Sequence, residues 1–528
     1  MRKIFVLTSI FTILILGLLG WYISTGFYWV LGFMMILIIM GIQDLVQKKH
    51  TLMRNFPVLG RLRWLAEAIR PKMYQYFIES DTDGTPINRI DRNTIYQRAK
   101  KQLNTIPFGT QMDVYAEGYE WMSHSIAPKD FHNLDHNPRV IVGNKDCKQP
   151  YSCSILNVSA MSFGSLSTAA IESLNGGAKR GGFAHNTGEG GISSYHLKNG
   201  GDLIWQIGTG YFGARGADGK FSFDVFKLNA LRPEVKMIEI KLSQGAKPGH
   251  GGILPAKKNS PEIAAIRHVE PYTTVYSPPF HSAFSTPYEM IEFIGKVRET
   301  SGGKPVGFKL CIGHKSEFIG ICRAMIELDI YPDFITVDGG EGGTGAAPQE
   351  FSNYVGAPFV DSVAFVHNML EGFGIRQHIK ILGSGKILSG FHIVRAMALG
   401  ADVCMSARAM MLALGCIQAL VCNTNTCPTG IATQDPQLVA GLVVPNKIVR
   451  VANYHEETVK AFVELLGAAG IDSNGKLTRD HIYRRISMNE AKTFEEIFPS
   501  LEKGCMLRGE IPVKYQEDYR RSDMHKWS

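Results

Sequence analysis

The sequence predicts an α/β protein: a (β/α)8 barrel of the TIM type, preceded by an N-terminal hairpin of two transmembrane helices. Three observations lead to this prediction. Short apolar runs alternate with helical patterns through the middle of the 528-residue chain, as they do where crossover helices join parallel strands. Glycine clusters follow several of these runs. Two uncharged apolar stretches open the chain.

The two opening stretches, Ile4–Tyr22 and Phe27–Ile42, contain no charged residue, and Ser24–Gly26 separates them. The first has about the length that crosses a bilayer. Aromatic residues flank the break, and Lys and Arg precede the first stretch and follow the second. This pattern predicts a membrane protein with both ends of the hairpin on the cytoplasmic side. A cleaved signal peptide, the alternative, explains only the first stretch.

The rest of the chain is expected on the cytoplasmic side, where structural disulfides are rare. Its net charge of +8 is spread without a long Lys/Arg block, so we expect no nucleic-acid partner. We expect four segments: a transmembrane helical hairpin at 1–45, a juxtamembrane and N-terminal extension at 46–135, the barrel with its cysteine segment at 136–445, and a helical C-terminal extension at 446–528.

Apolar runs mark the strands of the barrel, and they are apolar on both faces, as in a buried parallel sheet. The predicted strands are Ser154–Ala160, Val235–Leu242, Pro305–Ile312, Asp333–Val337, Ile379–Leu382 and Asp402–Met405. The predicted helices are Arg92–Leu103, Thr286–Glu299, Lys315–Leu328, Asp361–Glu371 and Gly390–Leu399.

Glycine clusters distinguish a barrel from a doubly wound sheet, which should show one glycine fingerprint after its first strand. Here the clusters recur at Gly188–Gly191, Gly339–Gly343 and Gly383–Gly385. A barrel assembles its site from all its strand-end loops, and glycine turns at helix N-termini suit a phosphate. The alternative is that these glycines only make tight turns.

Three cysteines, Cys416, Cys422 and Cys427, fall within twelve residues with the spacing C-x5-C-x4-C. Zinc sites usually have four ligands in paired C-x2-C spacings, which this segment lacks. Thiolates from a compact run hold iron–sulfur clusters. Three close cysteines favour a three-iron cluster, but Cys404 is a possible fourth ligand and leaves a four-iron cluster open. Buried structural thiols are the remaining alternative.

Five motifs occur in the order found in the FMN-binding domain of glutamate synthase, and the chain resembles that family over roughly residues 140 to 445. They are NVSAMSFGSLS at Asn157–Ser167, NTGEGG at Asn186–Gly191, IKLSQGAKPGHGG at Ile240–Gly252, VDGGEGGTGAAP at Val337–Pro348 and CNTNTCPTGIATQ at Cys422–Gln434. The resemblance implies a TIM-like barrel that carries FMN and a [3Fe-4S] cluster, with Cys416, Cys422 and Cys427 as ligands.

The resemblance also implies a reaction. Reduced FMN delivers a hydride to 2-iminoglutarate, formed from 2-oxoglutarate and ammonia, and gives L-glutamate. Lys247 and Arg267 match substrate positions of the family, and Arg suits a planar carboxylate. Gln244 and Glu189 match two further substrate positions, and Glu189 is the candidate for stabilising positive charge on nitrogen. Lys247 and Glu189 are thus the expected catalytic residues.

FMN is expected beside Ala160, Met161 and Ser162, with Gln206 and Lys309 near its pyrimidine edge. The phosphate-loop candidates are Gly340, Gly383, Ser384, Gly385, Ser406 and Arg408. For His281 and His314, a site role and a loop role stay open. The cluster would pass electrons to FMN from a ferredoxin-like protein or a membrane carrier.

The chain departs from the large glutamate synthases in two ways. It begins with the hairpin and has no cysteine before Cys147, so we expect no glutaminase domain. The family's KPGEGGQLP reads KPGHGGILP here, with His250 and Ile253 in place of an acid and an amide. Another oxo acid, another amine, a different flavin-dependent oxidation or an electron-transfer subunit without amination activity are therefore alternative functions.

Overall fold

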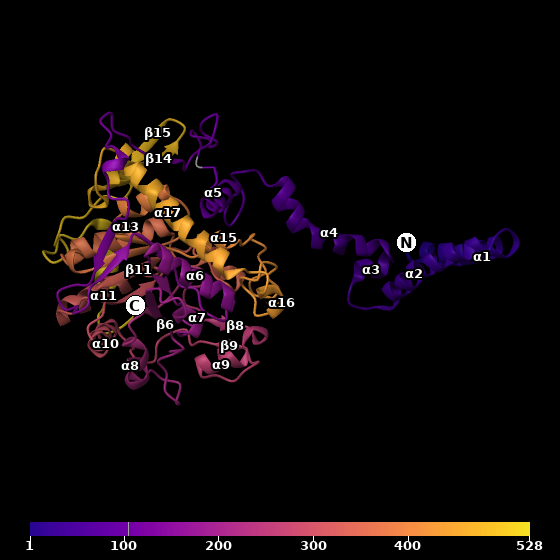
Figure 1. The fold of residues 1–528 in the computed structure, drawn as a ribbon, viewed down its shortest axis with the longest axis horizontal. Coiled ribbons are helices and arrows are strands. Elements are labelled where there is room, and N and C mark those ends of the chain that lie inside the picture. The colour runs from indigo at the N-terminus through magenta and orange to yellow at the C-terminus, as the bar shows by residue number, and fades with distance from the viewer. Residues whose placement is uncertain (104, 528) are drawn as a thin grey trace. The chain divides into compact units, whose positions relative to one another are not determined.

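The computed structural model describes every residue except those at positions 104 and 528, and the chain divides into two compact units. The first unit comprises Met1–Ile90 and the second Asp91–Ser528. In Figure 1 the first unit is indigo to dark violet, and the second runs from violet to yellow. The domain expected at 46–135 therefore spans the division after Ile90.

Two long apolar helices open the first unit, α1 (Arg2–Tyr22) and α2 (Gly26–Val46), and they pack against each other. The packing is tight, since a Cβ added at Gly41 would lie 2.0 Å from Cζ of Phe5. Both are long and apolar enough to cross a membrane, a test that a signal sequence or a core helix also passes. The two predicted helices are confirmed as helices. Two shorter helices follow, α3 (Thr51–Asn55) and α4 (Leu59–Met73), and a π-helical turn, η1 (Tyr74–Ile78).

The second unit is built on a closed barrel of eight parallel strands, as predicted. Around the barrel the order is β10-β11-β12-β13-β4-β5-β6-β7. The strands are β4 (Leu156–Val158), β5 (His185–Asn186), β6 (Leu203–Ile207), β7 (Val235–Lys241), β10 (Val306–Leu310), β11 (Phe334–Asp338), β12 (Lys380–Ser384) and β13 (Val403–Ser406). The predicted runs overlap six of them, and β11, β12 and β13 extend one or two residues beyond the predicted ends. They omit β5, which is only two residues long, and β6, where Gln206 interrupts the apolar pattern.

Helices surround the barrel and connect its strands (Figure 1). They are α6 (Thr168–Gly181), α7 (Ser194–Leu197), α8 (Phe223–Ala230), α10 (Pro287–Thr300), α11 (Lys315–Leu328), α13 (Phe359–Gly372), α14 (Gly390–Ala398), α15 (Arg408–Leu414) and α17 (Val444–Ala468). The predicted helix Lys315–Leu328 coincides with α11. Before the barrel, α5 (Arg89–Lys100) lies within the predicted range Arg92–Leu103 except at its first residues.

The C-terminal part differs from the expected helical extension in two respects. The long helix α17 packs against α6, α14 and α15, so it belongs to the barrel rather than to a segment that begins after residue 445. Beyond it, β14 (Ile482–Ser487) and β15 (Glu490–Thr493) form an antiparallel sheet with β1 (Glu120–Met122). The sequence signal for these strands is weak because they are polar and partly exposed.

The interior of the barrel is apolar near the N-terminal ends of its strands. There Ile204, Met237, Phe334, Leu382 and Val403 form one buried cluster. The cluster includes side chains of a hairpin made of β2 (Arg139–Val142) and β3 (Tyr151–Ser154). Side chains on a strand alternate between faces, so two residues after Met237 the interior position of β7 is Glu239.

Glu239 is fully buried and forms the polar middle layer of the barrel. Its Oε1 accepts hydrogen bonds from Asn186 Nδ2 at 2.9 Å and Gln206 Nε2 at 2.6 Å, and its Oε2 accepts one from the hydroxyl of Thr336 at 2.5 Å. One carboxylate thereby links β5, β6, β7 and β11. Such a network is tolerated in a barrel core because every member has a partner.

We predict that Glu239→Ala destabilises the second unit by about 3 kcal/mol, because it leaves three buried donors without their acceptor. Urea unfolding of the full chain, followed by tryptophan fluorescence, measures the loss. The matched control, Thr336→Val, removes one donor and should cost about 1 kcal/mol. An equal cost for both variants would contradict the central role of Glu239.

Candidate functional site

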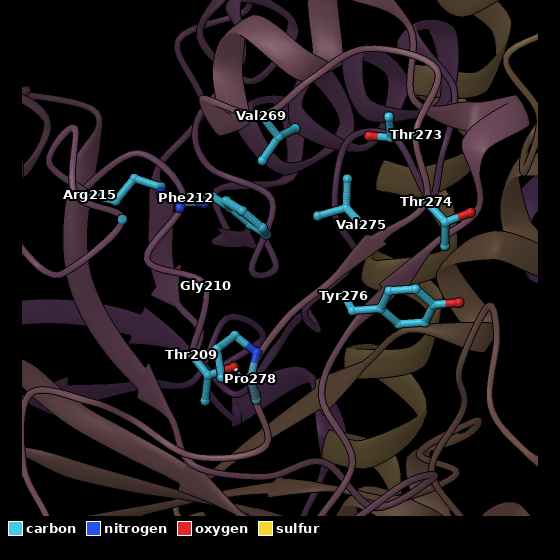
Figure 2. A pocket seen from close by; sticks show the side chains of 11 residues that line it. Thr209, Gly210, Phe212, Arg215, Val269, Thr273, Thr274, Val275, Tyr276 and Pro278 are labelled. Atoms are coloured by element: carbon cyan, nitrogen blue, oxygen red, sulfur yellow. Dashed lines mark hydrogen bonds between the residues drawn. The ribbon is translucent and has the colours of Figure 1, made fainter.

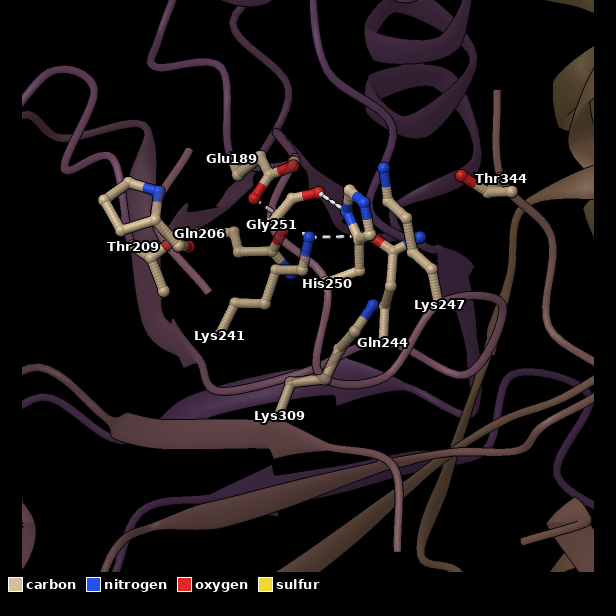
Figure 3. A network of polar contacts seen from close by, with 12 residues as sticks. Glu189, Gln206, Thr209, Lys241, Gln244, Lys247, His250, Gly251, Lys309 and Thr344 are labelled. Atoms are coloured by element: carbon tan, nitrogen blue, oxygen red, sulfur yellow. Dashed lines mark hydrogen bonds and ion pairs between the residues drawn. The ribbon is translucent and has the colours of Figure 1, made fainter. Parts of the chain in front are cut away.

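Charged side chains gather at the C-terminal ends of the barrel strands, above the Glu239 layer. Lys241 ends β7, Lys309 lies in β10 and Asp338 ends β11. Lys309 Nζ pairs with Asp338 Oδ2 at 3.4 Å. Figure 3 shows Glu189, Lys241, Gln244, Lys247 and Lys309 gathered in this region. All active-site groups of TIM barrels lie at this end, because the strand-to-helix loops converge there.

Glu189, in the loop after β5, is at the centre of the network. Its Oε2 accepts a hydrogen bond from Lys241 Nζ at 2.9 Å, and the same Nζ donates to Gln244 Oε1 at 2.7 Å. Two glycines make room for the carboxylate: a Cβ at Gly208 would lie 2.6 Å from Oε2, and one at Gly252 would lie 2.5 Å from Oε1. Any larger residue at either position would displace Glu189.

Arg267, at the end of α9 (Pro261–Arg267), reaches the same loop from the side. It is 5% exposed, and its Nη2 donates to the carbonyl oxygen of Phe163 at 3.0 Å. Its guanidinium carbon lies 5.0 Å from the ring centre of Phe212, a cation–π distance. Its buried Nε has no hydrogen-bond partner among the described residues. A buried guanidinium with an unused donor is suited to receive a carboxylate.

Lys247 follows Gln244 in the long loop after β7 and is 4% exposed. Its Nζ donates to the carbonyl oxygen of Ala346 at 2.9 Å, so it bridges to the glycine-rich loop after β11. That loop approaches closely elsewhere too: a Cβ at Gly245 would lie 1.7 Å from the carbonyl oxygen of Gly339.

Burial and mutual charge set the protonation of these groups. Burial raises the pKa of Glu189, but Lys241, Lys247 and Arg267 outweigh it, and the pKa lies below its ordinary value. Burial lowers the pKa of Lys247 to about 8 and that of Arg267 to about 10, although Glu189 opposes both shifts. Glu189 is therefore ionised at neutral pH, and Lys247 titrates near physiological pH.

Lys309 behaves differently from Lys247. Burial lowers the pKa of Lys309, but the negative charges of Asp338, Glu239 and Glu189 outweigh this effect, and the pKa lies above its ordinary value. A permanently charged ammonium group therefore remains beneath the site. His281 is buried with a pKa lowered to about 4, mainly by burial, and it hydrogen-bonds Lys241 O and the hydroxyl of Tyr211. His281 is therefore neutral at physiological pH, and its two hydrogen bonds connect its own loop to Lys241 and Tyr211. His314 precedes α11 as its N-cap residue.

The residues expected around the flavin come from neighbouring strands, because β12, β13 and β4 are adjacent in the barrel. Ala160, Met161 and Ser162 follow β4, and they are only partly buried. A Cβ at Gly188 would lie 2.6 Å from the backbone nitrogen of Ser162. The hydroxyls of Ser384 on β12 and Ser159 lie 3.4 Å apart.

The five other phosphate-loop candidates also have identifiable protein contacts. A Cβ at Gly383 or Gly385 would collide with Phe359, and one at Gly340 would lie 2.7 Å from the carbonyl oxygen of Gly356. These glycines therefore serve close packing, whatever else they contact. Ser406, at the end of β13, donates to Ile387 O in the loop after β12, and Arg408, at the start of α15, donates to Glu341 O at 2.6 Å in the loop after β11. The expected pyrimidine contact Gln206 donates instead to Glu239, one layer below.

The three cysteines lie between α15 and α17. Burial is the main cause that raises the pKa of Cys416, to about 11, and the neighbouring Cys422 and Cys427 raise it further. Burial also raises the pKa of Cys427, but hydrogen bonds from Thr429 and from the N–H groups of residues 429, 431 and 432 outweigh it. The three sulfurs thus interact electrostatically. Cys404 is fully buried in β13, and none of the three is among the causes of its pKa shift.

In the described part of the chain, no group of three or more His, Cys, Asp or Glu side chains is arranged as a metal site. The cysteines are close enough to interact, but their sulfurs do not converge as ligands in this conformation. Lys258 is nearby. Its Nζ donates to the carbonyl oxygens of Ser165 and Ala432, and its charge interacts with Cys422 and Cys427.

A pocket of about 370 Å³ lies on the outer side of the same loops. Figure 2 shows its lining, in which Arg215 stands 5.8 Å from the ring centre of Phe212. Thr209, which follows Gly208, donates to Pro278 O at 2.6 Å across the pocket floor. Phe212 thus lines this pocket and also contacts the guanidinium of Arg267.

Residues 91–472 match the model of a protein family that is described as the conserved region in glutamate synthase. The chain belongs to this family. It is 38% identical to the glutamate synthase large subunit-like protein of Bacillus subtilis (strain 168), over 84% of this chain and 91% of that protein. It is 35% identical to an archaeal glutamate synthase [NADPH] of Methanocaldococcus jannaschii, over 63% of this chain and 62% of that enzyme.

Longer relatives match over a smaller share of their length. The chain is 33% identical to a ferredoxin-dependent glutamate synthase of Cyanidium caldarium, over 58% of this chain and 20% of that enzyme. Among solved structures, a mutant flavocytochrome b2 with pyruvate bound is similar with a TM-score of 0.41 and 12% identity, over 89% of this chain and 94% of that one. This last similarity is too distant to indicate a function.

The structure adds residues to the site that were not among the sequence candidates. Lys241 is the direct partner of Glu189, Asp338 pairs with Lys309, and Glu239 supports both from below. Their signal was present in the sequence, since Lys241 and Asp338 end apolar strands. The sequence did not reveal that Lys241 pairs with Glu189, because the two residues lie 52 positions apart.

We predict that Lys247 makes anion binding depend on pH. Below its pKa of about 8 the amine is charged and attracts a carboxylate, and above it the amine is neutral. Glutarate, measured by calorimetry on the purified protein, should therefore bind more weakly as pH rises past about 8. Lys247→Arg should abolish this transition because Arg stays charged.

The matched control is Lys257→Arg, an exposed cation of the same loop, which should leave the transition unchanged. A glutarate affinity that is flat between about pH 7 and pH 10 in the native protein would refute a titrating Lys247.

Proposed function

We propose that this protein is an oxidoreductase of the glutamate synthase type that acts on CH–NH2 groups. In this proposal it forms L-glutamate from 2-oxoglutarate and ammonia by reduction of 2-iminoglutarate. The observation that supports the proposal most directly is the buried network in which one carboxylate, Glu189, faces three cations, Lys241, Lys247 and Arg267. The network lies at the catalytic end of a barrel in a member of the glutamate synthase family.

The excess of cations suits a five-carbon dicarboxylate. Arg267 offers an unused buried donor, and Lys247 supplies a second positive charge in the same loop region. Gln244, whose side-chain oxygen accepts from Lys241, retains its NH2 group for a substrate oxygen. Two carboxylates can thus be bound without leaving a buried charge unpaired.

Glu189 would act on the nitrogen of the substrate. Because the surrounding cations keep it ionised, it can stabilise the positive charge of an iminium group beside it. Lys241 Nζ, hydrogen-bonded to the same carboxylate, holds a proton within reach of the site. The two residues would thereby control the protonation of the imine, which determines how readily its carbon accepts a hydride.

FMN is the cofactor that we propose for this site, and when bound it would supply the hydride. The loops after β4 and β5 approach each other closely at Ser162 and Gly188, and Lys309 provides a cation that stays charged. The residues that we propose to hold FMN are Ala160, Met161, Ser162, Lys309, Gly340, Gly383, Ser384, Gly385, Ser406 and Arg408. For Gln206, bonded to Glu239, we propose a supporting rather than a direct role.

We further propose that Cys416, Cys422 and Cys427 hold a [3Fe-4S] cluster. Backbone N–H groups around Cys427 lower its pKa, and such donors stabilise the negative sulfur of a cluster. Cys404 is fully buried within the barrel strand β13, whereas the other three cysteines lie in the segment after α15, and we therefore propose three ligands rather than four. The cluster would carry electrons between an external donor and the flavin site.

The N-terminal helices support a membrane location, with the second unit on the cytoplasmic side. The electron donor would then be a ferredoxin-like protein or a membrane carrier. The name of one relative contains the term ferredoxin-dependent, and the name of another contains the term NADPH.

The decisive experiment is an anaerobic assay of glutamate formation. Purified protein with its cofactors intact receives a strong one-electron donor, 2-oxoglutarate, and either ammonium or glutamine. We expect glutamate from ammonium. No glutamate from either nitrogen source, with a flavin that still reduces and reoxidises, would reject the proposed reaction.

The cluster has a separate test. We predict that Cys422→Ser removes most of the protein-bound iron and the electron paramagnetic resonance signal of the oxidised protein, because a three-iron cluster cannot lose one of three thiolates. Cys404→Ala, the matched control in a barrel strand, should keep both. Equal iron loss in the two variants would instead assign Cys404 as a ligand.

One observation favours a second candidate function. In the loop beside Glu189, His250 and Ile253 replace the acid and the amide of the large glutamate synthases. His250 Nδ1 bonds the carbonyl oxygen of Gly251 at 2.8 Å, and its ring lies edge-on to Phe351. Because this loop contacts Glu189 through Gly252, a different oxo acid or amine is the alternative substrate. Assaying a panel of oxo acids with ammonium separates the two possibilities. An electron-transfer subunit would turn over none of them.

A further inference from the structure

The helix α4 (Leu59–Met73) has two chemically distinct faces. Trp64, Ala68 and Pro71 lie on one side of the helix, and at 100° per residue its other apolar residues occupy one arc of roughly 120°. These residues are Leu59, Leu62, Leu65, Ala66, Ile69 and Met73. Cations stand at both borders of the arc, Arg63 and Arg70 on one side and Arg61 and Lys72 on the other. The only carboxylate of the helix, Glu67, lies on the opposite face.

The apolar arc is exposed in the described part of the chain. The exposed fraction is 61% for Leu62, 56% for Leu65 and 43% for Ile69. A single exposed leucine needs no explanation, but a continuous apolar stripe along a helix does. The π-helical turn that follows adds Tyr76 and Phe77, which are also exposed.

A buried ion pair fixes the start of α4 to the end of α2. Arg61 pairs with Asp44 at 2.8 Å, and Asp44, in the last turn of α2, is only 1% exposed. Asp44 Oδ2 also accepts a hydrogen bond from the backbone N–H of Val58 at 3.0 Å. Because α2 is about long enough to cross the hydrocarbon core, its last turn would lie at the level of the lipid headgroups, and α4 would begin there.

We propose that α4 lies in the interface of the membrane, with its apolar arc in the acyl-chain boundary and its border cations on anionic lipid headgroups. This inference rests on the proposed membrane location of α1 and α2. Arg and Lys at the edges of an apolar face can bury their methylene stems while their charges reach the headgroups. Because Asp44 neutralises Arg61, three further cations, Arg63, Arg70 and Lys72, stand against the single carboxylate of Glu67, and this excess complements a negatively charged leaflet.

The hairpin alone would attach the protein to the membrane in one way, whereas this arrangement attaches it in three. The hairpin inserts, α4 lies along the surface, and the aromatic residues of η1 (Tyr74–Ile78) extend the interfacial belt. The Asp44–Arg61 pair and the hydrogen bond from Val58 to Asp44 connect the start of α4 to the end of α2, so they favour a position of α4 near the surface when α2 is inserted.

The test is hydrogen–deuterium exchange of the full-length protein in three environments: detergent, nanodiscs of phosphatidylcholine, and nanodiscs that also contain phosphatidylglycerol. We expect amides of residues 59–73 to exchange at least about tenfold more slowly in the anionic nanodiscs than in detergent, because each cation near an anionic surface adds attraction. Protection should be smaller in the neutral nanodiscs.

Variants separate the apolar and the charged contributions. Leu65→Gln with Ile69→Gln should remove the protection in both lipids, and Arg63→Gln with Arg70→Gln should remove the difference between the lipids. Glu67→Gln frees Arg63 from its salt bridge with Glu67 at 3.5 Å and leaves the apolar arc unchanged, so it should keep or strengthen the protection in the anionic nanodiscs. A loss of protection in this variant would contradict the role of Arg63. Arg61 is left unchanged because it pairs with Asp44.

Protection of α1 and α2 in the same experiment reports on the hairpin. If they are protected in nanodiscs but residues 59–73 exchange as in detergent, the inference about α4 is wrong while the membrane location holds. If α1 and α2 are unprotected as well, the membrane location itself fails. Protection of α4 that depends on protein concentration rather than on lipid would assign the apolar arc to a second copy of the chain and overturn the proposal.

Discussion

The buried carboxylate of Glu239 is the constraint on which the architecture of the second unit depends. It joins four strands of the barrel through hydrogen bonds to Asn186, Gln206 and Thr336. Below it the barrel is filled by apolar side chains, and above it by charged ones. A barrel interior that becomes polar at only one end explains how one closed sheet can be both a stable core and a reactive site. Glu239 also raises the pKa of Lys309 directly, so the layer that stabilises the barrel helps to set the charge of the site.

Charge balance explains the geometry at the mouth of the barrel. Glu189 alone faces three cations, and a buried excess of positive charge is costly unless an anion completes it. Gly208 and Gly252 leave room for the side chain of Glu189. Its carboxylate needs this room because it must reach Lys241, which lies on a different strand. The site therefore carries an excess of positive charge, and in the proposed function a dicarboxylate substrate would balance that charge.

The cysteine segment is connected to the rest of the second unit by the chain that precedes the barrel. The hydroxyl of Tyr96, on α5, donates to the carbonyl oxygen of Cys416 at 2.6 Å, although the two residues lie 320 positions apart. Lys258, from the loop after β7, donates to the carbonyl oxygens of Ser165 and Ala432. The segment is therefore held between α5 and the loop that carries the substrate candidates. Such a position suits a group that passes electrons to a site in the barrel.

The sequence alone determined the periodic part of this protein. Apolar runs and glycine clusters predicted the barrel, the uncharged stretches predicted α1 and α2, and motif order predicted the family. These features are local, and hydrophobic periodicity records them directly. Only the tertiary structure decided which charges meet. Lys241 and Asp338 are ordinary strand ends in the sequence, and the hydrogen bond from Gln206 to Glu239 joins residues on two different strands. β1 was missed because its partner β14 lies more than 350 residues away, and the β14–β15 hairpin was missed because its strands are polar and partly exposed. Pairing across such distances depends on how the chain closes in space, and no local pattern encodes it.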